Sequence, residues 1–256
     1  MIKFEIQDGV GKITLDRAKK YHAFVREMAL LLQEKLDQCA SKNSVRAILI
    51  TATGKAFCAG QDLAEAIDPS IGSISTIIQE HYNPIIRKIR NIEKPIVAAV
   101  NGVAAGAGAS IALACDITVA TESATFVQAF SKIGLIPDSG ATFILPRLVG
   151  RQKAAALMMT AESITAKDAE KMGMIYKTFS NDEFEKESWK LVSRLAKMPT
   201  KALGLTKKLL NESINNDLEK QLNMEDKYQI ISANTDDFKE GVQSFLEKRK
   251  PKFKGS

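Results

Sequence analysis

The chain has 256 residues, of which 45% are hydrophobic and 26% charged, a balance that is typical of a folded globular protein and excludes wholesale disorder. Its length predicts one core domain with an appendage. The formal net charge is +6, and 6% of the residues are aromatic. A mild positive charge with little base-stacking surface fits a small polyanionic ligand at least as well as nucleic acid.

Three cysteines form no CxxC pair, and together with two histidines they provide no spacing that is typical of a zinc site. We therefore expect a reduced, intracellular protein without a metal ion. The chain starts directly with strand-like alternation and not with a signal peptide. The longest weakly polar stretch, residues 103–115, is too short to span a bilayer. The sequence predicts a cytoplasmic protein with neither a membrane nor a nucleic acid as partner.

The first 120 residues alternate between strand and helix patterns. Apolar alternation on both sides of Gly9 and Gly11 predicts a hairpin, and the later strands are apolar at nearly every position. The predicted elements are, in order, a hairpin over residues 2–15, a helix over 25–39, a strand over 45–52, a helix over 74–92 and strands over 96–100 and 116–120. Apolar strands separated by helices are typical of a parallel sheet that is covered on both faces. The sequence thus predicts an α/β fold.

From about residue 181 the strand patterns end, and three or four amphipathic helices follow. The last of them begins at a Thr235 N-cap. It carries an apolar stripe that needs a partner surface, formed by Phe238, Val242, Phe245 and Leu246. We divide the chain into a core over residues 1–195 and a helical oligomerisation region over residues 196–256.

Three short motifs invite functions that the sequence does not support. Gly106-Ala-Gly108 follows a strand, as in dinucleotide-binding loops, but position 111 holds Ile where that fingerprint needs a third small residue. The surroundings of Ser110 resemble a nucleophile elbow, but both histidines precede it, so the chain order of a hydrolase triad is missing. Cys58 has no neighbouring base, and we expect a buried structural thiol.

Two Gly-rich turns, residues 54–62 and 101–108, each follow a predicted strand. Alone, each is a tight strand-exit loop. Together they place free backbone N–H groups at the edge of a parallel sheet, beyond the carboxyl ends of the strands, where open α/β sheets bind ligands. Two converging N–H groups, one of them at a helix N-terminus, make an oxyanion hole, which stabilises negative charge on a reacting carbonyl oxygen.

The motifs Phe57-Cys-Ala-Gly-Gln-Asp-Leu63, Asn101-Gly-Val-Ala-Ala-Gly-Ala-Gly108, Cys115-Asp116 and Gly134-Leu-Ile-Pro-Asp-Ser-Gly140 resemble the crotonase (enoyl-CoA hydratase/isomerase) superfamily. The likeness runs from the first hairpin to the last helix. Within the superfamily, residues 130–138 and 240–251 are most similar to the ring-epoxide isomerases of phenylacetate catabolism. The resemblance implies a spiral of ββα turns and a C-terminal helical region that builds trimers, often paired into hexamers.

Position by position, the resemblance implies that the N–H groups of Gln61 and Ala107 form the oxyanion hole. The substrate is then an acyl-CoA thioester, whose CoA part supplies the polyanion, and no separate cofactor is expected. In relatives, Arg17, Lys19 and Lys20 match residues that hold CoA, and Phe245 and Lys248 match residues that often come from a neighbouring subunit. The alternative for residues 248–254 is a solvated tail. The residues expected to bind substrate are Arg17, Lys19, Ala59, Gly60, Asp62, Leu63, Gly106, Gly108, Phe130, Phe245 and Lys248.

The catalytic side chain that the resemblance implies is Asp138. Its position serves as the acid/base in several isomerases of the superfamily and as the nucleophile in dehalogenases. Hydratases of the superfamily use two glutamates, at positions that hold Ser110 and Phe130 here, and neither side chain is a base at neutral pH. Considered alone, Asp138 sits in a turn before a predicted helix, so its alternative role is that of a helix N-cap.

We therefore expect an acyl-CoA isomerase that moves a double bond or rearranges a ring epoxide, with Asp138 as the proton shuttle. The first alternative is an enoyl-CoA hydratase, or another lyase or hydrolase of CoA esters with the same fold. The second alternative is a non-catalytic CoA-binding subunit.

Overall fold

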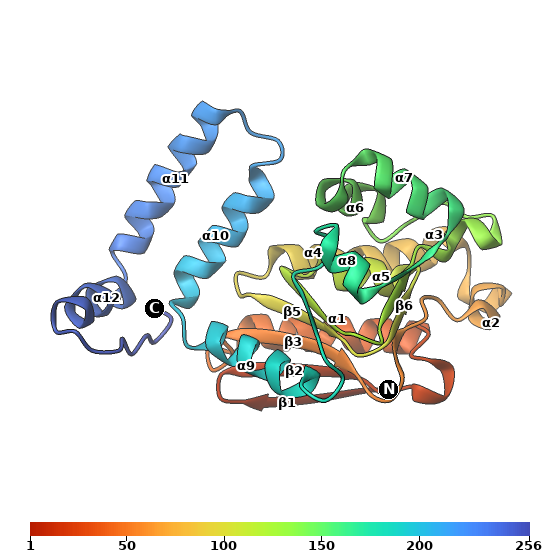
Figure 1. Cartoon of the computed structure of the whole chain (residues 1–256), viewed down its shortest axis with the longest axis horizontal. Coiled ribbons are helices and arrows are strands. Elements are labelled where there is room, and N and C mark those ends of the chain that lie inside the picture. The colour runs from red at the N-terminus through yellow and green to blue at the C-terminus, as the bar shows by residue number, and fades with distance from the viewer.

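The computed structural model describes all residues, 1–256, and contains two β-sheets (Figure 1). The larger sheet has the spatial strand order β1 (Ile2–Gln7), β2 (Val10–Leu15), β3 (Ala47–Ala52), β5 (Ile96–Val100), β7 (Ile117–Thr121) and β10 (Lys177–Phe179). The strands β1 and β2 form the predicted antiparallel hairpin, and the other neighbouring pairs are parallel. The hairpin closes at Asp8 and Gly9, which both have positive φ, as a two-residue turn between twisted strands requires.

The smaller sheet consists of three-residue strands, which the sequence pattern did not predict because so short a segment carries no periodicity. Its strands are, in spatial order, β4 (Ala56–Cys58), β6 (Val103–Ala105), β8 (Thr125–Val127) and β9 (Ser163–Thr165). Three times along the chain, a strand of the larger sheet leads into a strand of the smaller sheet and then into a helix. This repeat is the spiral of ββα turns that the motifs implied, so the expected fold class is confirmed.

Helices cover both faces of the larger sheet. In β3, Ile48 faces the main hydrophobic core, whereas Leu49 faces Val192 and Ala196 on the other side, since successive side chains of a strand alternate. The helices of the core are α1 (Arg26–Ser41), α2 (Leu63–Ala66), α3 (Ile74–Thr76), α4 (Asn83–Asn91), α5 (Ala107–Ala114), α6 (Ala141–Val149), α7 (Arg151–Thr160), α8 (Ala166–Lys171) and α9 (Phe184–Ala196), with 3-10 turns η1 (Ala18–Lys20), η2 (Pro69–Ile71) and η4 (Ala129–Ile133). All eight residues of α5 are buried.

The single helix predicted over residues 74–92 is interrupted. Between α3 and α4 lies a π-helix of six residues, η3 (Ile77–Tyr82). Pro84, the second residue of α4, lacks the N–H that a regular α-helix would use at this point, so the uninterrupted α-helix was a wrong prediction. π-Helical segments are frequent at functional sites, and η3 contains Tyr82, which bonds to the Gln61 side chain.

The last three helices form an arm that projects from the core, here called the C-terminal arm (Figure 1). It consists of α10 (Thr200–Glu212), α11 (Leu218–Ala233) and α12 (Asp236–Leu246). As predicted, Thr235 caps α12, and its side-chain oxygen accepts a hydrogen bond from the Phe238 N–H at 3.1 Å. A buried ion pair of 2.8 Å between Lys207 and Asp116 fixes α10 to the core. No helix of the molecule has both the length and the apolar character needed to cross a lipid bilayer.

The basic segment Lys248–Lys254 is bound along α12. The Asp237 carboxylate accepts hydrogen bonds from the Lys254 and Gly255 N–H groups at 2.6 and 2.8 Å. The Glu240 carboxylate accepts one from the Lys252 N–H at 2.7 Å. The backbone of this segment is thus held against α12, while the side chains of Lys248, Lys250, Lys252 and Lys254 are exposed to solvent, as the alternative of a solvated tail expected.

The two Gly-rich turns interlock where β4 and β6 lie side by side. A Cβ on Gly102 would overlap the Lys55 carbonyl oxygen, and a Cβ on Gly108 would lie 2.6 Å from the Cys58 Cβ. Glycine is required at both positions because no side chain fits between the two backbones. We call this contact the glycine clasp. It holds the start of α5 against the turn that follows β4.

Gly108→Ala is expected to lower the free energy of unfolding by about 1–3 kcal/mol, because the added methyl group has no space beside Cys58. Denaturant unfolding measures this change. The control is Gly241→Ala in α12, where the new Cβ would meet Phe253 at an ordinary 3.5 Å. That substitution should be neutral or stabilise the helix by up to about 1 kcal/mol. Equal stability of Gly108→Ala and the wild type would contradict the clasp.

Candidate active site

The glycine clasp brings two backbone N–H groups together. Gln61 follows β4, and Ala107 is the first residue of α5. A Cβ on Gly60 would lie 3.5 Å from the Ala107 nitrogen, so the two turns are in contact at this point. The Ala107 N–H lies in the first turn of a helix, where backbone donors have no intrahelical acceptor and the helix dipole is positive.

The Gln61 N–H is a free donor as well. Phe24 pairs with this turn: its N–H donates to the Gly60 carbonyl at 2.7 Å, and its carbonyl accepts from the Asp62 N–H at 2.9 Å. In a trans peptide the N–H points opposite to the C=O, so the Gln61 N–H points away from Phe24. It has no acceptor within the protein. Two free donors at adjacent turns are the arrangement that stabilises a developing oxyanion.

Asp138 lies in the turn before α6. Burial raises the pKa of its carboxyl group, and the Ser139 hydroxyl, which donates to Oδ1 at 2.8 Å, opposes this shift by a smaller amount. The N-cap of α6 is Gly140, and no side chain caps that helix, so the predicted alternative of Asp138 as a helix cap is wrong. Ser139 has a φ of 52°, a strained conformation for a residue other than glycine. A desolvated carboxylate in a strained turn is typical of a functional site.

The continuous segment η3–α4 connects this turn to the Gln61 turn. At the end of η3, the Tyr82 hydroxyl donates to Gln61 Oε1 at 2.7 Å. One helical turn later, Ile86 lies close to the other turn, since a Cβ on Gly140 would lie 3.5 Å from the Ile86 Cγ2. Burial is the main cause that raises the pKa of the Tyr82 hydroxyl, and the charge of Asp138 is a smaller cause. The Tyr82 hydroxyl thus contacts the Gln61 turn, and its pKa responds to the charge of Asp138.

The positions of the two hydratase glutamates lie beside Gly106. The hydroxyl of the buried Ser110 donates to the Gly106 carbonyl at 3.1 Å. The Phe130 ring is buried and would lie 3.8 Å from a Cβ on Gly106. Cys58 is fully buried, and burial raises the pKa of its thiol to about 12, which agrees with a structural thiol. None of these three side chains is a base at neutral pH.

Tyr82 and Glu65 contact the Gln61 side chain, and the sequence did not identify either of them. Both oxygens of Glu65 accept from the Arg26 N–H at the start of α1, at 2.8 and 3.0 Å. Glu65 also accepts from Gln61 Nε2 at 3.2 Å, so its carboxylate both caps the start of α1 and holds the Gln61 side chain. In the sequence, Tyr82 follows the apolar spacing of a helix and is indistinguishable from a core residue. No group of three or more His, Cys, Asp or Glu side chains is placed to hold a metal ion.

Residues 5–256 match the family model described as enoyl-CoA hydratase/isomerase. The chain belongs to this family. It is 40% identical to the 1,2-epoxyphenylacetyl-CoA isomerase of Escherichia coli (strain K12), over 98% of this chain and 97% of that protein. It is also 40% identical to a protein of Rhodobacter capsulatus named probable enoyl-CoA hydratase, over 99% of this chain and 98% of that protein. The crystal structure of an enoyl-CoA hydratase from Polaromonas sp. JS666 has a TM-score of 0.92 at 32% identity, and the match covers 98% of this chain and 99% of that one.

In this enzyme of the enoyl-CoA hydratase/isomerase family, most of the residues predicted to bind substrate lie around the Gln61 turn. Arg17 forms an ion pair of 2.8 Å with Asp62, and the Arg17 guanidinium is the main cause that lowers the pKa of that carboxyl group. Lys19 is exposed on η1. This 3-10 turn lies beside the Gln61 turn, where the Ala59 N–H donates to the Tyr21 carbonyl at 2.9 Å. Ala59 and Leu63 are both exposed, Leu63 at the start of α2.

Phe245 and Lys248 lie elsewhere. Phe245 lies in the last turn of α12 and Lys248 two residues beyond its end, and α12 is on the side of the molecule opposite to α2 (Figure 1). The Phe245 side chain is 82% exposed, so nothing in its own chain covers it. A single chain therefore does not bring these two residues to the Gln61 turn.

Asp138→Asn is expected to make the enzyme more stable at pH 7, because asparagine removes a charge that burial disfavours in the folded state. The amide oxygen can still accept the Ser139 hydrogen bond. Since the folded-state pKa of Asp138 is raised, the difference in stability should shrink as the pH falls through that pKa and vanish below about pH 4, where aspartate is also protonated in the unfolded chain.

Thermal unfolding midpoints of both proteins, measured between about pH 8 and pH 3, test this expectation. A variant that is less stable than the wild type at pH 7 would show that the carboxylate stabilises the fold and is not a strained functional group.

Proposed function

We propose that this enzyme is an acyl-CoA isomerase that shifts a double bond, or rearranges a ring epoxide, with a single carboxylate. The observation that carries the proposal is Asp138. It is half-buried with a raised pKa, it caps no helix, and the same helix segment supports its turn and the Gln61 turn. The positions of the two hydratase glutamates hold a hydrogen-bonded serine and a buried phenylalanine, which supports isomerisation over hydration.

In the double-bond shift, Asp138 removes a proton from the α-carbon of a 3-enoyl thioester. The electron pair of that C–H bond spreads through the thioester carbonyl and the double bond, and the oxyanion accepts hydrogen bonds from the Gln61 and Ala107 N–H groups. Each such donor contributes roughly 3–4 kcal/mol to the transition state. Asp138 then returns the proton to the γ-carbon, which gives the 2-enoyl thioester without net gain or loss of atoms. A raised pKa makes this carboxylate a stronger base than an exposed aspartate.

The proposal of an acyl-CoA thioester as substrate rests on the basic residues near the Gln61 turn. Lys19 and Lys20 are exposed on η1 and can reach the phosphates of CoA. Arg17 is already paired with Asp62, so we assign it chiefly to fixing the N-terminal end of α2, where the Asp62 side chain accepts from the Ala64 N–H at 3.1 Å. The double-bond shift involves no electron transfer, and Asp138 carries out both of its proton transfers.

Asp138→Asn is expected to lower kcat for a 3-enoyl-CoA or ring-epoxide ester by about 10²–10⁴-fold, because asparagine cannot shuttle a proton. Binding of the CoA ester should remain nearly unchanged, as measured by calorimetric titration with a saturated acyl-CoA. The control is Asp182→Asn, which neutralises an exposed carboxylate in the turn before α9 and should leave both values unchanged. An unimpaired rate in Asp138→Asn would refute the mechanism.

The competing function is hydration, and the Rhodobacter capsulatus relative bears that name. The discriminating measurement compares kcat/KM for isomerisation of a 3-enoyl-CoA with kcat/KM for hydration of crotonyl-CoA on one enzyme preparation. Isomerisation should exceed hydration by orders of magnitude, since no second carboxylate is present at position 110 or 130 to hold and deprotonate water. Fast hydration would establish the alternative, and tight binding without either turnover would indicate a CoA-binding subunit.

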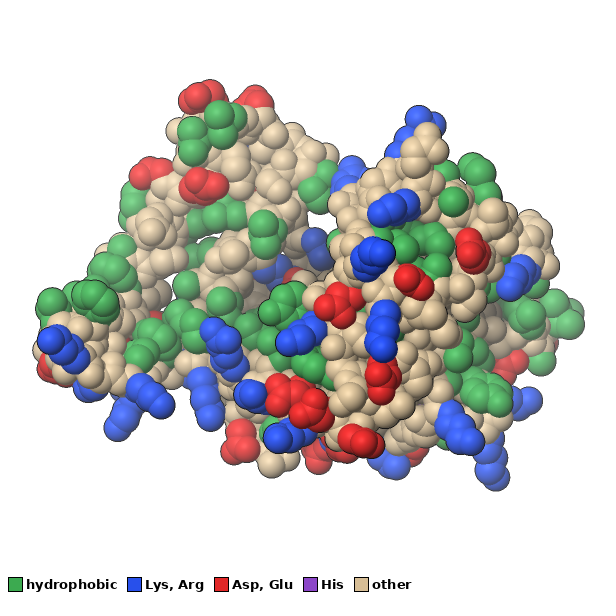
Figure 2. All heavy atoms as spheres, in the orientation of Figure 1, with side chains coloured by type: hydrophobic (Ala, Val, Ile, Leu, Met, Phe, Trp, Pro, Cys, Tyr) green, Lys and Arg blue, Asp and Glu red, His purple; other side chains and the backbone are tan.

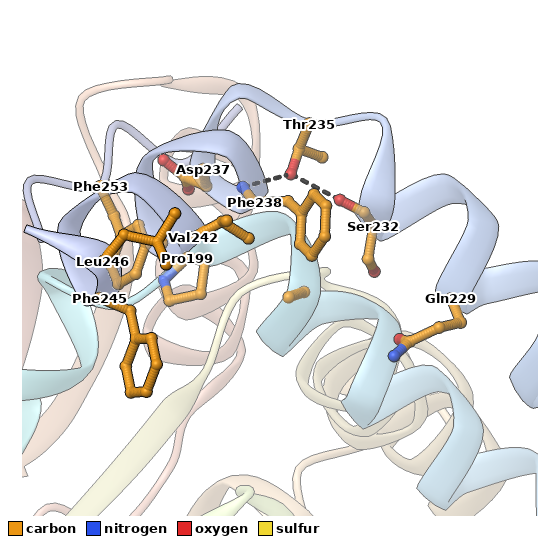
Figure 3. Close-up of a pocket in the computed structure, with 12 residues that line it drawn as sticks. Pro199, Gln229, Ser232, Thr235, Asp237, Phe238, Val242, Phe245, Leu246 and Phe253 are labelled. Carbon is orange, nitrogen blue, oxygen red and sulfur yellow. Dashed lines mark hydrogen bonds between the residues drawn. The ribbon is translucent and has the colours of Figure 1, made fainter.

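We also propose that the enzyme assembles through the C-terminal arm into a trimer or a pair of trimers. Hydrophobic side chains gather over the arm (Figure 2), and a groove of about 540 Å³ lies between its helices (Figure 3). The apolar residues around this groove include Pro199, Phe238, Val242, Phe245, Leu246 and Phe253. An exposed apolar surface of this kind is typical of a protein–protein interface.

Light scattering is expected to give a mass of three or six chains of 28.0 kDa. Replacing two exposed residues of α12, as in Phe238→Ser with Phe245→Ser, should shift the protein toward smaller species. It should also weaken CoA binding, because Lys248 of another copy could no longer reach the site. A 28.0 kDa wild-type monomer with full activity would contradict both expectations.

A further inference from the structure

We infer that the Tyr82 hydroxyl is a positioning residue for catalysis: through the Gln61 side chain, it holds the Gln61 N–H in the direction that the substrate oxyanion requires. The inference rests on the proposed oxyanion chemistry and adds a residue to it. Tyr82 is not placed to touch the reacting atoms, since it is 1% exposed and its hydroxyl is already bonded to Gln61 Oε1 at 2.7 Å.

The Gln61 peptide is held from two sides. On one side, the Phe24 N–H donates to the Gly60 carbonyl at 2.7 Å, which fixes the plane of the Gly60–Gln61 peptide. On the other side, the Gln61 amide group lies between the Tyr82 hydroxyl and Glu65, at 2.7 and 3.2 Å. Gly60 itself has a φ of 92° and no side chain that would hinder rotation, so the orientation of the peptide depends on these outside contacts.

Tyr82 takes part in both restraints. Its hydroxyl holds the Gln61 side chain, and its ring packs on the Phe24 ring, with the centroids 5.9 Å apart and the planes tilted by 52°. A single side chain therefore links the residue that fixes the peptide plane to the residue that carries the donor. Removing the hydroxyl alone abolishes the hydrogen bond to Gln61 and leaves the ring contact with Phe24 intact, so the two restraints can be tested separately.

The π-helix explains how the tyrosine reaches this position. The Asn83 N–H bonds to the carbonyl of Ile78, five residues earlier, in place of the four-residue spacing of an α-helix. Pro84 has no N–H for the Glu80 carbonyl, and the Gln33 side-chain amide of α1 donates to that oxygen at 2.7 Å. The wider turn is thus stabilised by a residue of another helix. Such local irregularity, held in place from outside, is typical of segments that orient functional groups.

The test uses Tyr82→Phe and a bound reporter of carbonyl polarisation, [1-13C]hexanoyl-CoA, which is saturated and cannot isomerise. In the wild type, the two N–H donors should shift the thioester C=O stretching band of the bound ester to lower frequency than in water. In Tyr82→Phe, part of this shift should be lost. In a separate assay, kcat for isomerisation of a 3-enoyl-CoA should fall by about tenfold, which is the rate equivalent of one neutral hydrogen bond. The dissociation constant for hexanoyl-CoA should change by less than about twofold, because CoA contacts elsewhere carry the affinity.

Two further variants distinguish positioning from a loss of fold. Gln61→Met keeps the backbone N–H and removes the side chain that Tyr82 holds, so it should cause a similar loss, and the double variant should be no worse than either single one. Tyr228→Phe removes a hydroxyl from another buried tyrosine, on α11, and should leave the band and kcat unchanged.

The outcomes separate this inference from the proposed function. An unshifted band in the wild-type complex would refute the oxyanion hole, and the role of Tyr82 with it. A shifted band in the wild type that stays unchanged in Tyr82→Phe, together with an unchanged kcat, would refute the role of Tyr82 alone. Additive losses in the double variant would also overturn it, because they would mean that Tyr82 and Gln61 act independently.

Discussion

The contact of Gly108 with Cys58 is the constraint on which the site depends. The two backbones approach so closely that no side chain fits between them, and this approach brings the start of the buried helix α5 to the turn after β4. Because α5 lies inside the core, its N-terminus cannot shift without disturbing both sheets. The Ala107 N–H is therefore held by the packing of the whole domain, and the Gln61 N–H meets it because β4 and β6 are neighbours.

The carboxylate is supported in a different way. Asp138 sits in an irregular turn with a strained serine next to it, and Ile86 of α4 lies close to Gly140 in the same turn. The same helix segment carries Tyr82, which braces Gln61. One helix segment therefore lies against both the turn that carries Gln61 and the turn that carries Asp138. This arrangement removes the Asp138 carboxylate partly from water. Because burial disfavours the charged form, the pKa of Asp138 is raised.

The C-terminal arm connects to this core at a buried charge pair. Asp116 accepts hydrogen bonds from Lys207 of the arm and from the Ile96 N–H at the start of β5, each at 2.8 Å. The attraction within a buried charged pair offsets the loss of hydration only when such additional hydrogen bonds are present. Removing one partner would leave an uncompensated charge in the interior. The arm is therefore firmly held at α10, while its apolar surface on α12 remains uncovered in a single chain. In the proposed assembly, this surface contacts another copy of the chain, and Lys248 reaches the active site of that copy.

Local pattern determined the long elements and the motif positions. Periodicity and capping depend only on neighbouring residues, and they predicted the hairpin, α1, β3, β5, three or four C-terminal helices and the Thr235 cap. The Gly-rich turns also showed where donors would lie, because strand exits share one edge of a parallel sheet. The three-residue strands of the smaller sheet, the π-helix and the partners of Gln61 were decided by the tertiary structure. Each of them depends on a contact between distant segments, such as Gln33 with Glu80 or Tyr82 with Gln61, and no local sequence pattern encodes such a contact.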